Sequence, residues 1–342
     1  MGMKILVTGG AGFIGSNFVH YLTDKYPEYE LTVVDLLTYA GDRGRLADVD
    51  SKIEFVKADI VDKKIVDDLV RGKDWVVHFA AETHVDRSIA DPGPFLATNI
   101  MGTEILTRAA IKHKVKRFHH VSTDEVFGTL ELGSSERFNE QTAYSPRSPY
   151  AASKAASDHL VRAYGETYGL PFTITNCSNN YGPSDSPGRV IPVFITNALQ
   201  NKPLPIYGKG RAIRDYLFVT DHCAAIDLAL HKGKLGQTYC VGGAAQKNGV
   251  EVARAVLDAL GKPKELIEFV TDRPGHDMRY DIDPSYIEKS LGWKQSVSFE
   301  EGIAKTVEWY KSHEAWWKPY KERLDLMRDA DLYKTKSKTE TT

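Results

Sequence analysis

The sequence predicts an α/β fold: a Rossmann-type doubly wound parallel sheet with a smaller C-terminal substrate-binding lobe. A short apolar run at residues 5–8 ends at Gly9-Gly10-Ala11-Gly12-Phe13-Ile14-Gly15 and leads into a helical pattern. Apolar runs then alternate with helical patterns through the first half of the chain, which is typical of a parallel sheet covered on both faces. The length of 342 residues favours two lobes over one, because it exceeds the usual size of a single domain.

The individual elements follow from these patterns. We expect strands at residues 5–8, 31–35, 53–57, 75–79, 117–122 and 172–176, and helices at residues 16–25, 63–71, 94–113 and 150–165. After Cys177 the chain is rich in Pro, Gly and Asn, with shorter helical patterns near 190–201, 220–231, 250–260 and 299–313. We therefore predict a cofactor-binding domain at 1–177, a lobe at 178–330 from which some segments return to the first domain, and a disordered tail at 331–342.

Composition excludes several classes of function. The 44 basic and 46 acidic residues give a net charge of −2, so there is no broad basic field for nucleic acid or an anionic membrane. The 3 cysteines, Cys177, Cys223 and Cys240, are widely spaced, which fits a reducing compartment and argues against a disulfide framework. No apolar run approaches the ~20 residues of a membrane span, and the first strand leaves no room for a signal peptide. We expect a cytoplasmic enzyme without a metal site.

The glycine-rich turn predicts a dinucleotide site. Gly9, Gly12 and Gly15 are spaced to supply a positive φ, a close approach to a pyrophosphate, and tight packing of the helix on the strand. The pyrophosphate would lie at the N-terminus of the following helix. A glycine-rich turn without a ligand is the alternative, but the preceding strand and Asp35 argue against it.

Asp35 indicates which dinucleotide binds. It ends the second predicted strand, twenty residues after Gly15, where a carboxylate accepts hydrogen bonds from ribose hydroxyls and repels a 2′-phosphate. NAD is therefore favoured over NADP. After the third strand, Asp59 and Ile60 either hold the adenine edge or cap the strand end. After the fourth strand, Ala80 and Ala81 provide small-residue backbone suited to lie under the cofactor.

Tyr150 and Lys154 predict redox chemistry at an alcohol or sugar carbon. They lie four residues apart, which is one helical turn on the same face. A free phenol has a pKa near ~10, and a neighbouring ammonium lowers that pKa toward the range of a useful base. The alternative is a routine pair on an amphipathic helix, and the glycine fingerprint argues against it.

Thr123, Asp124 and Glu125 follow the fifth predicted strand, at the edge of the sheet where doubly wound folds carry their active sites. Thr123 can hydrogen-bond the substrate oxygen that Tyr150 deprotonates. The adjacent carboxylates add an acid and a base that a simple dehydrogenase does not need. Their alternative role is to cap the next segment or to face solvent.

At this point the chain resembles a known family, the dTDP-glucose 4,6-dehydratases of the extended short-chain dehydrogenase/reductase superfamily. The resemblance spans residues 4–317. Its matching segments are residues 34–35, 38–41, 80–88, 98–99, 122–128, 148–158, 177–183, 214–215 and 272–277. The Thr-Asp-Glu triplet and the Asp272-Arg273-Pro274-Gly275-His276 segment are specific to dehydratases, since the related epimerases usually lack the acidic pair.

The resemblance implies a closed redox cycle. Tyr150 deprotonates the 4-hydroxyl of the glucose ring while NAD oxidises C4, and the 4-ketone acidifies the C5 proton. Glu125 removes that proton, Asp124 protonates the departing 6-hydroxyl, and the stored hydride returns to C6. This requires a neutral Asp124 beside an ionised Glu125, which like-charge repulsion in a partly desolvated pocket favours.

The resemblance also implies the remaining site residues. It places the catalytic set at Thr123, Asp124, Glu125, Tyr150 and Lys154. It places NAD against Gly9, Gly12, Phe13, Ile14, Gly15, Asp35, Leu36, Leu37, Thr38, Asp59, Ile60, Phe79, Ala80, Ala81, Thr98, Tyr150, Lys154 and Asn180. It places the nucleotide sugar against Thr83, Thr123, Asn179, Arg189, Val190, Pro205, Ile206, Tyr207, Arg214, Asn248, Asp272, Arg273, Pro274, Gly275 and His276.

Two of these residues also carry an argument of their own. The Arg214 guanidinium suits a diphosphate in a chain without a general basic field. Tyr207 either stacks on the base or is a core tyrosine at the end of a short strand.

Several positions depart from the family pattern. These are Leu36, Phe127, Cys240, Met278 and the 184–189 loop. The loop belongs to the nucleotide-sugar region, so UDP-glucose, CDP-glucose or a GlcNAc derivative is an alternative substrate. A nucleotide-sugar epimerase or decarboxylase and a non-catalytic NAD sensor are the competing functions, and the intact catalytic set argues against both.

The resemblance further implies a homodimer. In this superfamily the Tyr150 helix and the 94–113 helix pair with their symmetry mates as a four-helix bundle. Small residues on both helices, Ala109, Ala110, Ala151, Ala155 and Ala156, are expected to allow close packing between subunits.

Overall fold

The computed structural model describes residues 2–272 and 277–322, which form two compact units. Unit 1 comprises Met1–Asn180, Ala212–Asn248 and Pro274–Phe299. Unit 2 comprises Tyr181–Arg211, Gly249–Arg273 and Glu300–Thr342. The chain leaves unit 1 just after the expected boundary at residue 177 and then returns to it twice. The tail expected at 331–342 lies outside the described residues.

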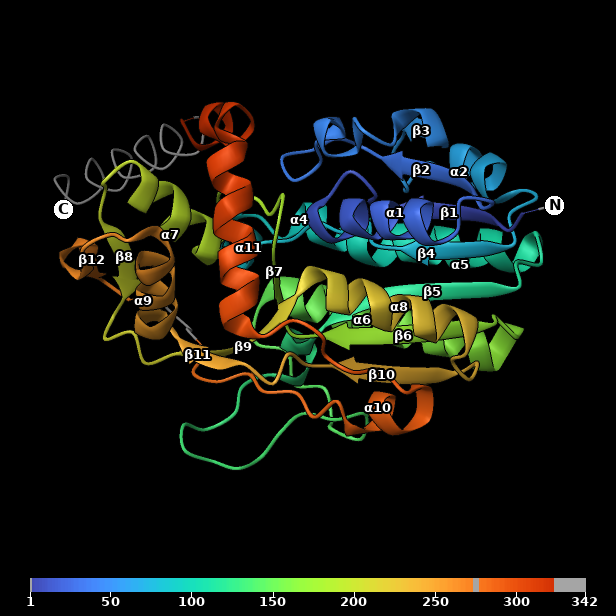
Figure 1. Cartoon of the computed structure of the whole chain (residues 1–342). Coiled ribbons are helices and arrows are strands. Elements are labelled where there is room, and N and C mark those ends of the chain that lie inside the picture. The colour runs from blue at the N-terminus through green and yellow to red at the C-terminus, as the bar shows by residue number, and fades with distance from the viewer. Residues whose placement is uncertain (1, 273–276, 323–342) are drawn as a thin grey trace, which may run out of the picture. The chain divides into compact units, whose positions relative to one another are not determined.

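Unit 1 contains, in its described part, a seven-stranded sheet with the order β10-β6-β5-β4-β1-β2-β3 (Figure 1). All neighbouring strands are parallel. The strands are β1 (Lys4–Thr8), β2 (Glu30–Asp35), β3 (Ile53–Lys57), β4 (Trp75–His78), β5 (Arg117–Thr123), β6 (Phe172–Cys177) and β10 (Gln237–Val241). The strand order reverses between β1 and β4, and doubly wound folds bind ligands at such a switch point. The predicted fold class is confirmed.

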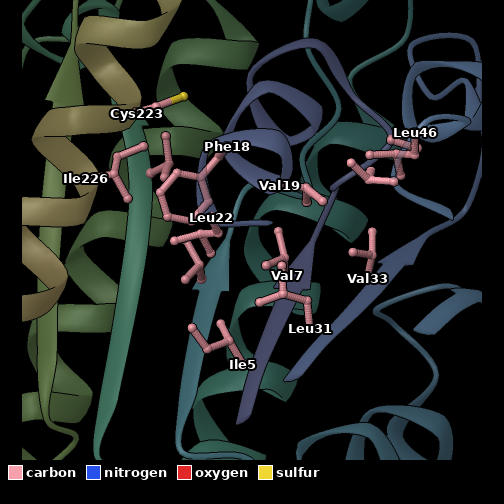
Figure 2. Close-up of a cluster of buried hydrophobic side chains, with 14 of the residues drawn as sticks. Ile5, Val7, Phe18, Val19, Leu22, Leu31, Val33, Leu46, Cys223 and Ile226 are labelled. Carbon is pink, nitrogen blue, oxygen red and sulfur yellow. The ribbon is translucent and has the colours of Figure 1, made fainter. Parts of the chain in front are cut away.

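Side chains of β1 alternate between the two faces of the sheet, because successive residues of a strand point to opposite sides. Ile5 and Val7 belong to the core on the face covered by α1 (Phe13–Lys25) and α8 (Val219–His231). In that core Phe18 and Leu22 of α1 lie near Ile226 of α8 (Figure 2). Both faces of the strand are buried, which explains why it reads as one continuous apolar run.

The opposite face of the sheet carries a second core. Leu6 of β1 packs there with residues of α2 (Lys63–Val70), α5 (Thr103–Lys112) and α6 (Pro149–Tyr168). Val161 of α6 is fully buried in this cluster. The helix that carries the tyrosine–lysine pair is therefore held on the sheet by apolar burial.

The ends of α6 follow from local sequence. Ser148 caps the N-terminus by accepting a hydrogen bond from Ala151 N at 3.1 Å, and Pro149 occupies the first turn, where its missing N–H costs nothing. Gly169 ends the helix in the left-handed conformation, with φ of 71°. The observed helix runs past the expected end at residue 165, because the glycine that stops it is Gly169.

The helical stretch expected at 94–113 exists at 93–112, but it is not one regular α-helix. The structure has a short α4 (Gly93–Phe95), a π-helical segment η3 (Leu96–Gly102) and then α5. A π-helical turn is wider than an α-helical turn, and over seven residues the difference in period is too small to be read from the apolar pattern. Such turns are frequent at functional sites, and this one contains Thr98 and Asn99.

Several short elements were absent from the sequence-based expectation. These are α3 (Val85–Ala90), α10 (Ser285–Leu291), β10, and the strands β7 (Asn179–Tyr181), β9 (Ile213–Phe218) and β11 (Gln246–Asn248). The last three form a small sheet in the order β11-β9-β7. β7 and β11 have three residues each, too few to show an alternation that identifies a strand.

Unit 2 is built from α7 (Val190–Leu199), α9 (Gly249–Leu260), a parallel pair of strands and α11 (Phe299–Ser312). The pair consists of β8 (Leu204–Tyr207) and β12 (Ile267–Val270). Ile195, Leu204 and Val256 are fully buried within this unit. The helices expected at 190–201, 250–260 and 299–313 therefore all exist, with ends that differ by one or two residues.

A polar cluster lies where α1 and α8 pack together. Asp227 Oδ2 accepts a hydrogen bond from Lys25 Nζ at 2.7 Å, and Asp227 Oδ1 lies 2.9 Å from His231 Nδ1. His231 Nε2 shares a 2.9 Å hydrogen bond with the Tyr29 hydroxyl. The hydrogen bond to Asp227 raises the pKa of His231, although burial opposes that shift.

His231→Gln is expected to destabilise the fold more in mildly acidic than in alkaline solution. The folded-state pKa of His231 exceeds its unfolded value of about 6.5. Its stabilisation is therefore complete below that value and is lost as the pH rises through the folded pKa. Thermal unfolding at about pH 5.5 and about pH 8.5 measures the difference, with the exposed His313→Gln as control. An equal loss at both pH values would contradict this role for His231.

No helix in residues 2–272 or 277–322 combines the length and apolar character of a membrane span.

Candidate active site

The glycine-rich turn joins β1 to α1 at the switch point of the sheet. Gly9 has φ of 69°, and a Cβ there would lie 2.5 Å from Ala80 N. A Cβ on Gly15 would lie 2.3 Å from Gly9 O, so the helix approaches the turn too closely for any side chain. Gly12 caps α1 without a side chain. The turn therefore leaves the helix N-terminus lined by backbone, which suits a pyrophosphate.

Asp35 lies at the end of β2 beside this turn. Its Oδ2 accepts a hydrogen bond from Ala11 N at 3.0 Å, and its Oδ1 accepts one from Leu37 N at 2.8 Å. Burial raises the pKa of Asp35, against the hydrogen bonds and the charge of Arg45. Each carboxylate oxygen has a second lone pair, so both can still accept a ribose hydroxyl.

Arg45 is a residue of this region that sequence reasoning missed. It is 7% exposed, and its guanidinium donates to Ala11 O at 3.0 Å and to Ala40 O at 2.8 Å. It thereby ties the loop after β2 to the glycine-rich turn. No motif marks it, because its partners are backbone carbonyls brought together by the fold.

Asp59 and Ile60 follow β3. Asp59 Oδ1 accepts a hydrogen bond from Val61 N at 3.0 Å, which is the strand-end cap named as one alternative. Ile60 is buried, and a Cβ on Gly102 of η3 would lie 2.5 Å from its Cδ1. Leu37 has φ of 57°, and Leu36 is 42% exposed.

A buried chain of hydrogen bonds runs from β1 to η3. Ala80 N donates to Thr8 Oγ1 at 3.2 Å, and Thr8 Oγ1 lies 2.7 Å from His78 Nδ1. His78 Nε2 lies 3.0 Å from Thr103 Oγ1, which donates to Asn99 O at 2.6 Å. Burial holds the pKa of His78 well below its usual range, so the imidazole is neutral. This chain supports the Phe79-Ala80-Ala81 backbone.

Asn99 links the loop after β4 to α6. Its Oδ1 accepts from Glu82 N at 2.8 Å, and its Nδ2 donates to Glu82 O at 3.0 Å and to Ser153 Oγ at 2.8 Å. Ser153 Oγ donates to Tyr150 O at 2.7 Å. The cofactor-side loop and the tyrosine helix are thus joined by one side chain.

Tyr150 and Lys154 lie on the first turns of α6. Lys154 is 4% exposed, and its Nζ donates to Val121 O of β5 at 2.9 Å. Burial lowers the pKa of Lys154, although the charge of Asp158 opposes that shift. The Tyr150 ring packs edge-on against Phe95, with centroids 6.3 Å apart.

The Thr123-Asp124-Glu125 triplet lies where β5 ends in a short 3₁₀ helix, η4 (Asp124–Phe127). Thr123 caps this helix by accepting from Glu125 N, and its hydroxyl donates to Asp124 Oδ1, both at 3.3 Å. Asp124 is 1% exposed, whereas Glu125 is half-buried. Burial first, and then the charges of Glu125 and Asp215, raise the pKa of Asp124 well above its usual value. The adjacent acids therefore occupy different environments.

Arg214 and Asp215 lie on β9. The Arg214 guanidinium donates to Ile213 O at 2.8 Å and to Asp277 O at 3.0 Å, and it lies 4.3 Å from the centre of the Tyr280 ring. Asp215 is fully buried and accepts hydrogen bonds from Gly243 N and Ala245 N, both at 3.0 Å. Burial raises the pKa of Asp215 to about 6.

The other residues expected to bind the nucleotide sugar lie on both units. In unit 1, Thr83 O accepts from the Tyr39 hydroxyl at 2.6 Å. Asn180, which was expected beside the cofactor, has its Oδ1 2.9 Å from His222 Nδ1. Asn179 Oδ1 is buried without a hydrogen-bond partner among the described residues. Asn248 ends β11.

In unit 2, Tyr207 is 50% exposed, so the alternative of a core tyrosine is wrong. Ile206 beside it is 2% exposed, and Arg189 and Val190 begin α7. The predicted residues Arg273, Pro274, Gly275 and His276 lie outside the described residues. Among the residues that the structure describes, no cluster of three or more His, Cys, Asp or Glu side chains is arranged to hold a metal.

Comparisons with known proteins identify the family. The family model for GDP-mannose 4,6 dehydratase matches residues 6–306. The dTDP-glucose 4,6-dehydratase of Mycolicibacterium smegmatis is 48% identical over 94% of this chain and 98% of its own length. That of Actinoplanes sp. is also 48% identical, over 92% of this chain and 100% of its own length.

Solved structures agree. DesIV, a dTDP-glucose 4,6-dehydratase from Streptomyces venezuelae solved with NAD bound, superposes with a TM-score of 0.90 at 46% identity. That match covers 93% of this chain and 100% of DesIV. The UDP-glucose 4-epimerase of Thermus thermophilus superposes with a TM-score of 0.83 at 33% identity, over 91% of this chain and 100% of the epimerase. This chain therefore belongs to the family of the dTDP-glucose 4,6-dehydratases.

Proposed function

We propose that this protein dehydrates a nucleotide-diphospho-glucose, dTDP-glucose first among the candidates, to its 4-keto-6-deoxy product with NAD as cofactor. The observation that carries the proposal is the contrast within the acidic pair: Asp124 is buried with a raised pKa, and Glu125 beside it is half-buried. An elimination needs a protonated acid next to an ionised base; the raised pKa of Asp124 suits the acid, and the greater exposure of Glu125 suits the base. The family relationship points the same way.

The residues present fit NAD. At Gly9 and Gly15 neighbouring backbone atoms lie where a Cβ would be, so these positions require glycine. Because the turn carries no side chains there, a pyrophosphate can approach the N-terminus of α1. The Asp35 carboxylate would hold the ribose hydroxyls and exclude a 2′-phosphate. Bound NAD would accept a hydride from C4 of the sugar and return it to C6.

Each catalytic residue then has a defined task. Tyr150 takes the proton of the sugar 4-hydroxyl, and the Lys154 ammonium favours the phenolate that this requires. Thr123 holds the same oxygen by a hydrogen bond.

The acidic pair performs the elimination. Glu125 removes the proton from C5, which the 4-ketone has acidified, and Asp124 protonates the 6-hydroxyl so that it leaves as water. Glu125 afterwards returns a proton to C5. All five catalytic residues belong to unit 1.

Turnover against a panel of dTDP-, UDP-, CDP- and GDP-sugars tests the proposal. A 4-keto sugar develops a characteristic ultraviolet absorbance in alkali, whereas the product of a 4-epimerase does not. Absorbance with dTDP-glucose supports the assignment. If only a sugar carried by another nucleotide gives this absorbance, the assigned reaction stands and the assigned substrate must be changed. Epimerised product, or no turnover at all, would refute the dehydratase.

Gly15→Ala is expected to abolish retention of the cofactor. The added methyl would lie 2.3 Å from Gly9 O and 2.9 Å from Gly10 Cα, so the turn must move away from the helix N-terminus. Acid extraction of the wild-type protein should release NAD in near-stoichiometric amount, and the variant should release roughly a tenth or less. Gly72→Ala is the control for backbone strain alone, because Gly72 has φ of 74° and a Cβ there would meet nothing within 4 Å. Equal NAD content in both variants would contradict this role of the turn.

A homodimer is the assembly that we propose. Most of the small residues first expected to allow packing between subunits do not support it: Ala156 is half-buried, but Ala109, Ala110, Ala151 and Ala155 are buried inside the subunit. The support comes instead from exposed apolar side chains near η3: Ile89 at 59%, Leu96 at 48% and Met101 at 51%. Light scattering at micromolar concentration should give twice the chain mass, and Met101→Glu should shift it toward the monomer. A monomeric wild-type protein would contradict the proposal.

A further inference from the structure

Asp158 is a fully buried carboxylate of α6 that the proposed mechanism does not use. It lies one helical turn after Lys154, on the side of the helix that faces the sheet, and it is 0% exposed. Buried carboxylates are rare unless they are hydrogen-bonded or paired, because removing a charge from water is costly. Its surroundings therefore require an explanation.

Three donors from three different elements converge on one oxygen of Asp158. Its Oδ2 accepts from Ser122 Oγ of β5 at 2.9 Å, from the Tyr144 hydroxyl at 2.7 Å and from Asn176 Nδ2 of β6 at 3.1 Å. The other oxygen, Oδ1, lies 3.2 Å from His120 Nε2 of β5. Burial alone would raise the pKa of Asp158, but these neighbours and Lys154 hold it at about 2. These contacts favour the ionised carboxylate.

The same partners reach the catalytic triplet. Ser122 directly precedes Thr123, and Asn176 Nδ2 also donates to Thr123 O at 3.1 Å. Tyr144 in turn accepts a hydrogen bond from the Arg162 guanidinium at 2.8 Å, which fixes the phenol from its other side. One carboxylate thus ties α6 to the residues at which β5 ends.

We propose that Asp158 is a positioning residue: it fixes the Thr123-Asp124-Glu125 triplet relative to the Tyr150–Lys154 pair, and its negative charge offsets the buried Lys154 ammonium. The inference rests on the proposed function, because it assigns a role within that site. Asp158 itself would contact neither substrate nor cofactor. Its effect passes through Ser122 and Asn176 to the triplet, and through charge to Lys154.

The charges around Lys154 support this assignment. His78 of β4 and His120 of β5 are buried, and burial lowers the pKa of both. The Cys177 thiol of β6 also interacts with Lys154, and on α6 the facing group is Asp158. Of these, Asp158 is the ionised acid. Its charge therefore opposes the desolvation that would otherwise deprotonate the lysine.

Asp158→Asn removes the charge and weakens the hydrogen bonds at the same time. The asparagine amide oxygen is uncharged and has two lone pairs, so it cannot hold the three donors as the carboxylate does. Removal of a negative charge lowers the pKa of nearby acids, so the pH profile of kcat should move to lower pH. Misplacement of the triplet should lower kcat by about 10–100-fold with KM nearly unchanged, since no substrate contact is altered.

Two further variants give matched controls. Tyr144→Phe removes one hydrogen bond and keeps the charge, so kcat should fall less and the pH profile should stay in place. Val161→Ala creates a cavity in the fully buried apolar side of the same helix, and it should lower the unfolding temperature without changing kcat or the pH profile. It measures the effect of general destabilisation.

Hydrogen exchange of the peptide that covers residues 120–126 provides a readout without substrate. Exchange should be faster in Asp158→Asn than in Val161→Ala at equal distance below their unfolding temperatures. If Asp158→Asn matches Val161→Ala in kcat, pH profile and exchange, the inference is wrong. If the wild-type protein turns over no nucleotide sugar, the proposed function fails, and the exchange measurement still decides whether Asp158 anchors the triplet.

Discussion

Glu125→Gln should stop the reaction after the oxidation of C4. The amide has almost the shape of the carboxylate but cannot accept the C5 proton, so elimination should slow by about 10²–10⁴-fold, the usual effect of a positioned base. Tyr150 and Lys154 remain intact, and oxidation of the sugar should proceed. Reduced nicotinamide and a 4-keto-glucose intermediate should then accumulate on the enzyme. Stopped-flow absorbance at the reduced-nicotinamide band would detect them.

Asp124→Asn should give a related but distinct result. Asp124 is buried with a raised pKa, which suits a neutral acid that donates a proton. The asparagine amide can hydrogen-bond the 6-hydroxyl but cannot protonate it, so loss of water should again be slow. The C5 proton can still be removed by Glu125. Exchange of that proton with solvent deuterium should therefore persist in Asp124→Asn and be lost in Glu125→Gln.

A surface carboxylate provides the control for both variants. Glu131 is exposed and follows the same segment of chain, so Glu131→Gln should turn over at the wild-type rate. Wild-type turnover by Glu125→Gln would mean that the acidic pair is structural, and the dehydratase assignment would fail.

Tyr150→Phe should block the first step instead of the second. Without the phenol nothing removes the proton from the 4-hydroxyl, so kcat should fall by about 10²–10⁴-fold. No reduced nicotinamide should accumulate, in contrast to Glu125→Gln. Binding of substrate should change little, because the ring remains to pack against Phe95. Single-turnover absorbance and equilibrium binding together measure these outcomes.

Tyr168→Phe is the matched control on the same helix. Tyr168 is 61% exposed and lies at the far end of α6, so its variant should behave as wild type. Accumulation of reduced nicotinamide in Tyr150→Phe would show that another group takes the first proton, and the assigned role of Tyr150 would be wrong.

Local pattern was enough to predict the sheet, the glycine-rich turn and the positions of the principal helices. The buried strands of a parallel sheet read as continuous apolar runs, and a glycine with a positive φ or a close backbone approach leaves a visible signature. The tyrosine–lysine spacing and the acidic pair were readable for the same reason, because each depends on neighbours within one turn or one strand end.

Other features have no local signature. The π-helical turn at Leu96–Gly102 departs from the α-helical period over only seven residues, and β7 and β11, with three residues each, are too short to be distinguished from a loop. Arg45 is important only because the fold brings Ala11 O and Ala40 O within its reach. The difference in burial between Asp124 and Glu125 also depends on which parts of the fold cover each side chain. The proposed chemistry requires such a difference, but the sequence does not show that it exists.

The sequence by itself determined that this chain has a Rossmann-type fold with a glycine-rich turn after the first strand, and it led to the proposed catalytic set of Thr123, Asp124, Glu125, Tyr150 and Lys154. Only the tertiary structure decided how these residues are held. Asp158 lies more than thirty residues from Ser122 along the chain, and it meets Ser122 and Asn176 because α6 packs across β5 and β6. Burial removes these groups from water, and each must then find its partner inside the protein. These partners are close in space but far apart along the chain, so the sequence alone does not identify them.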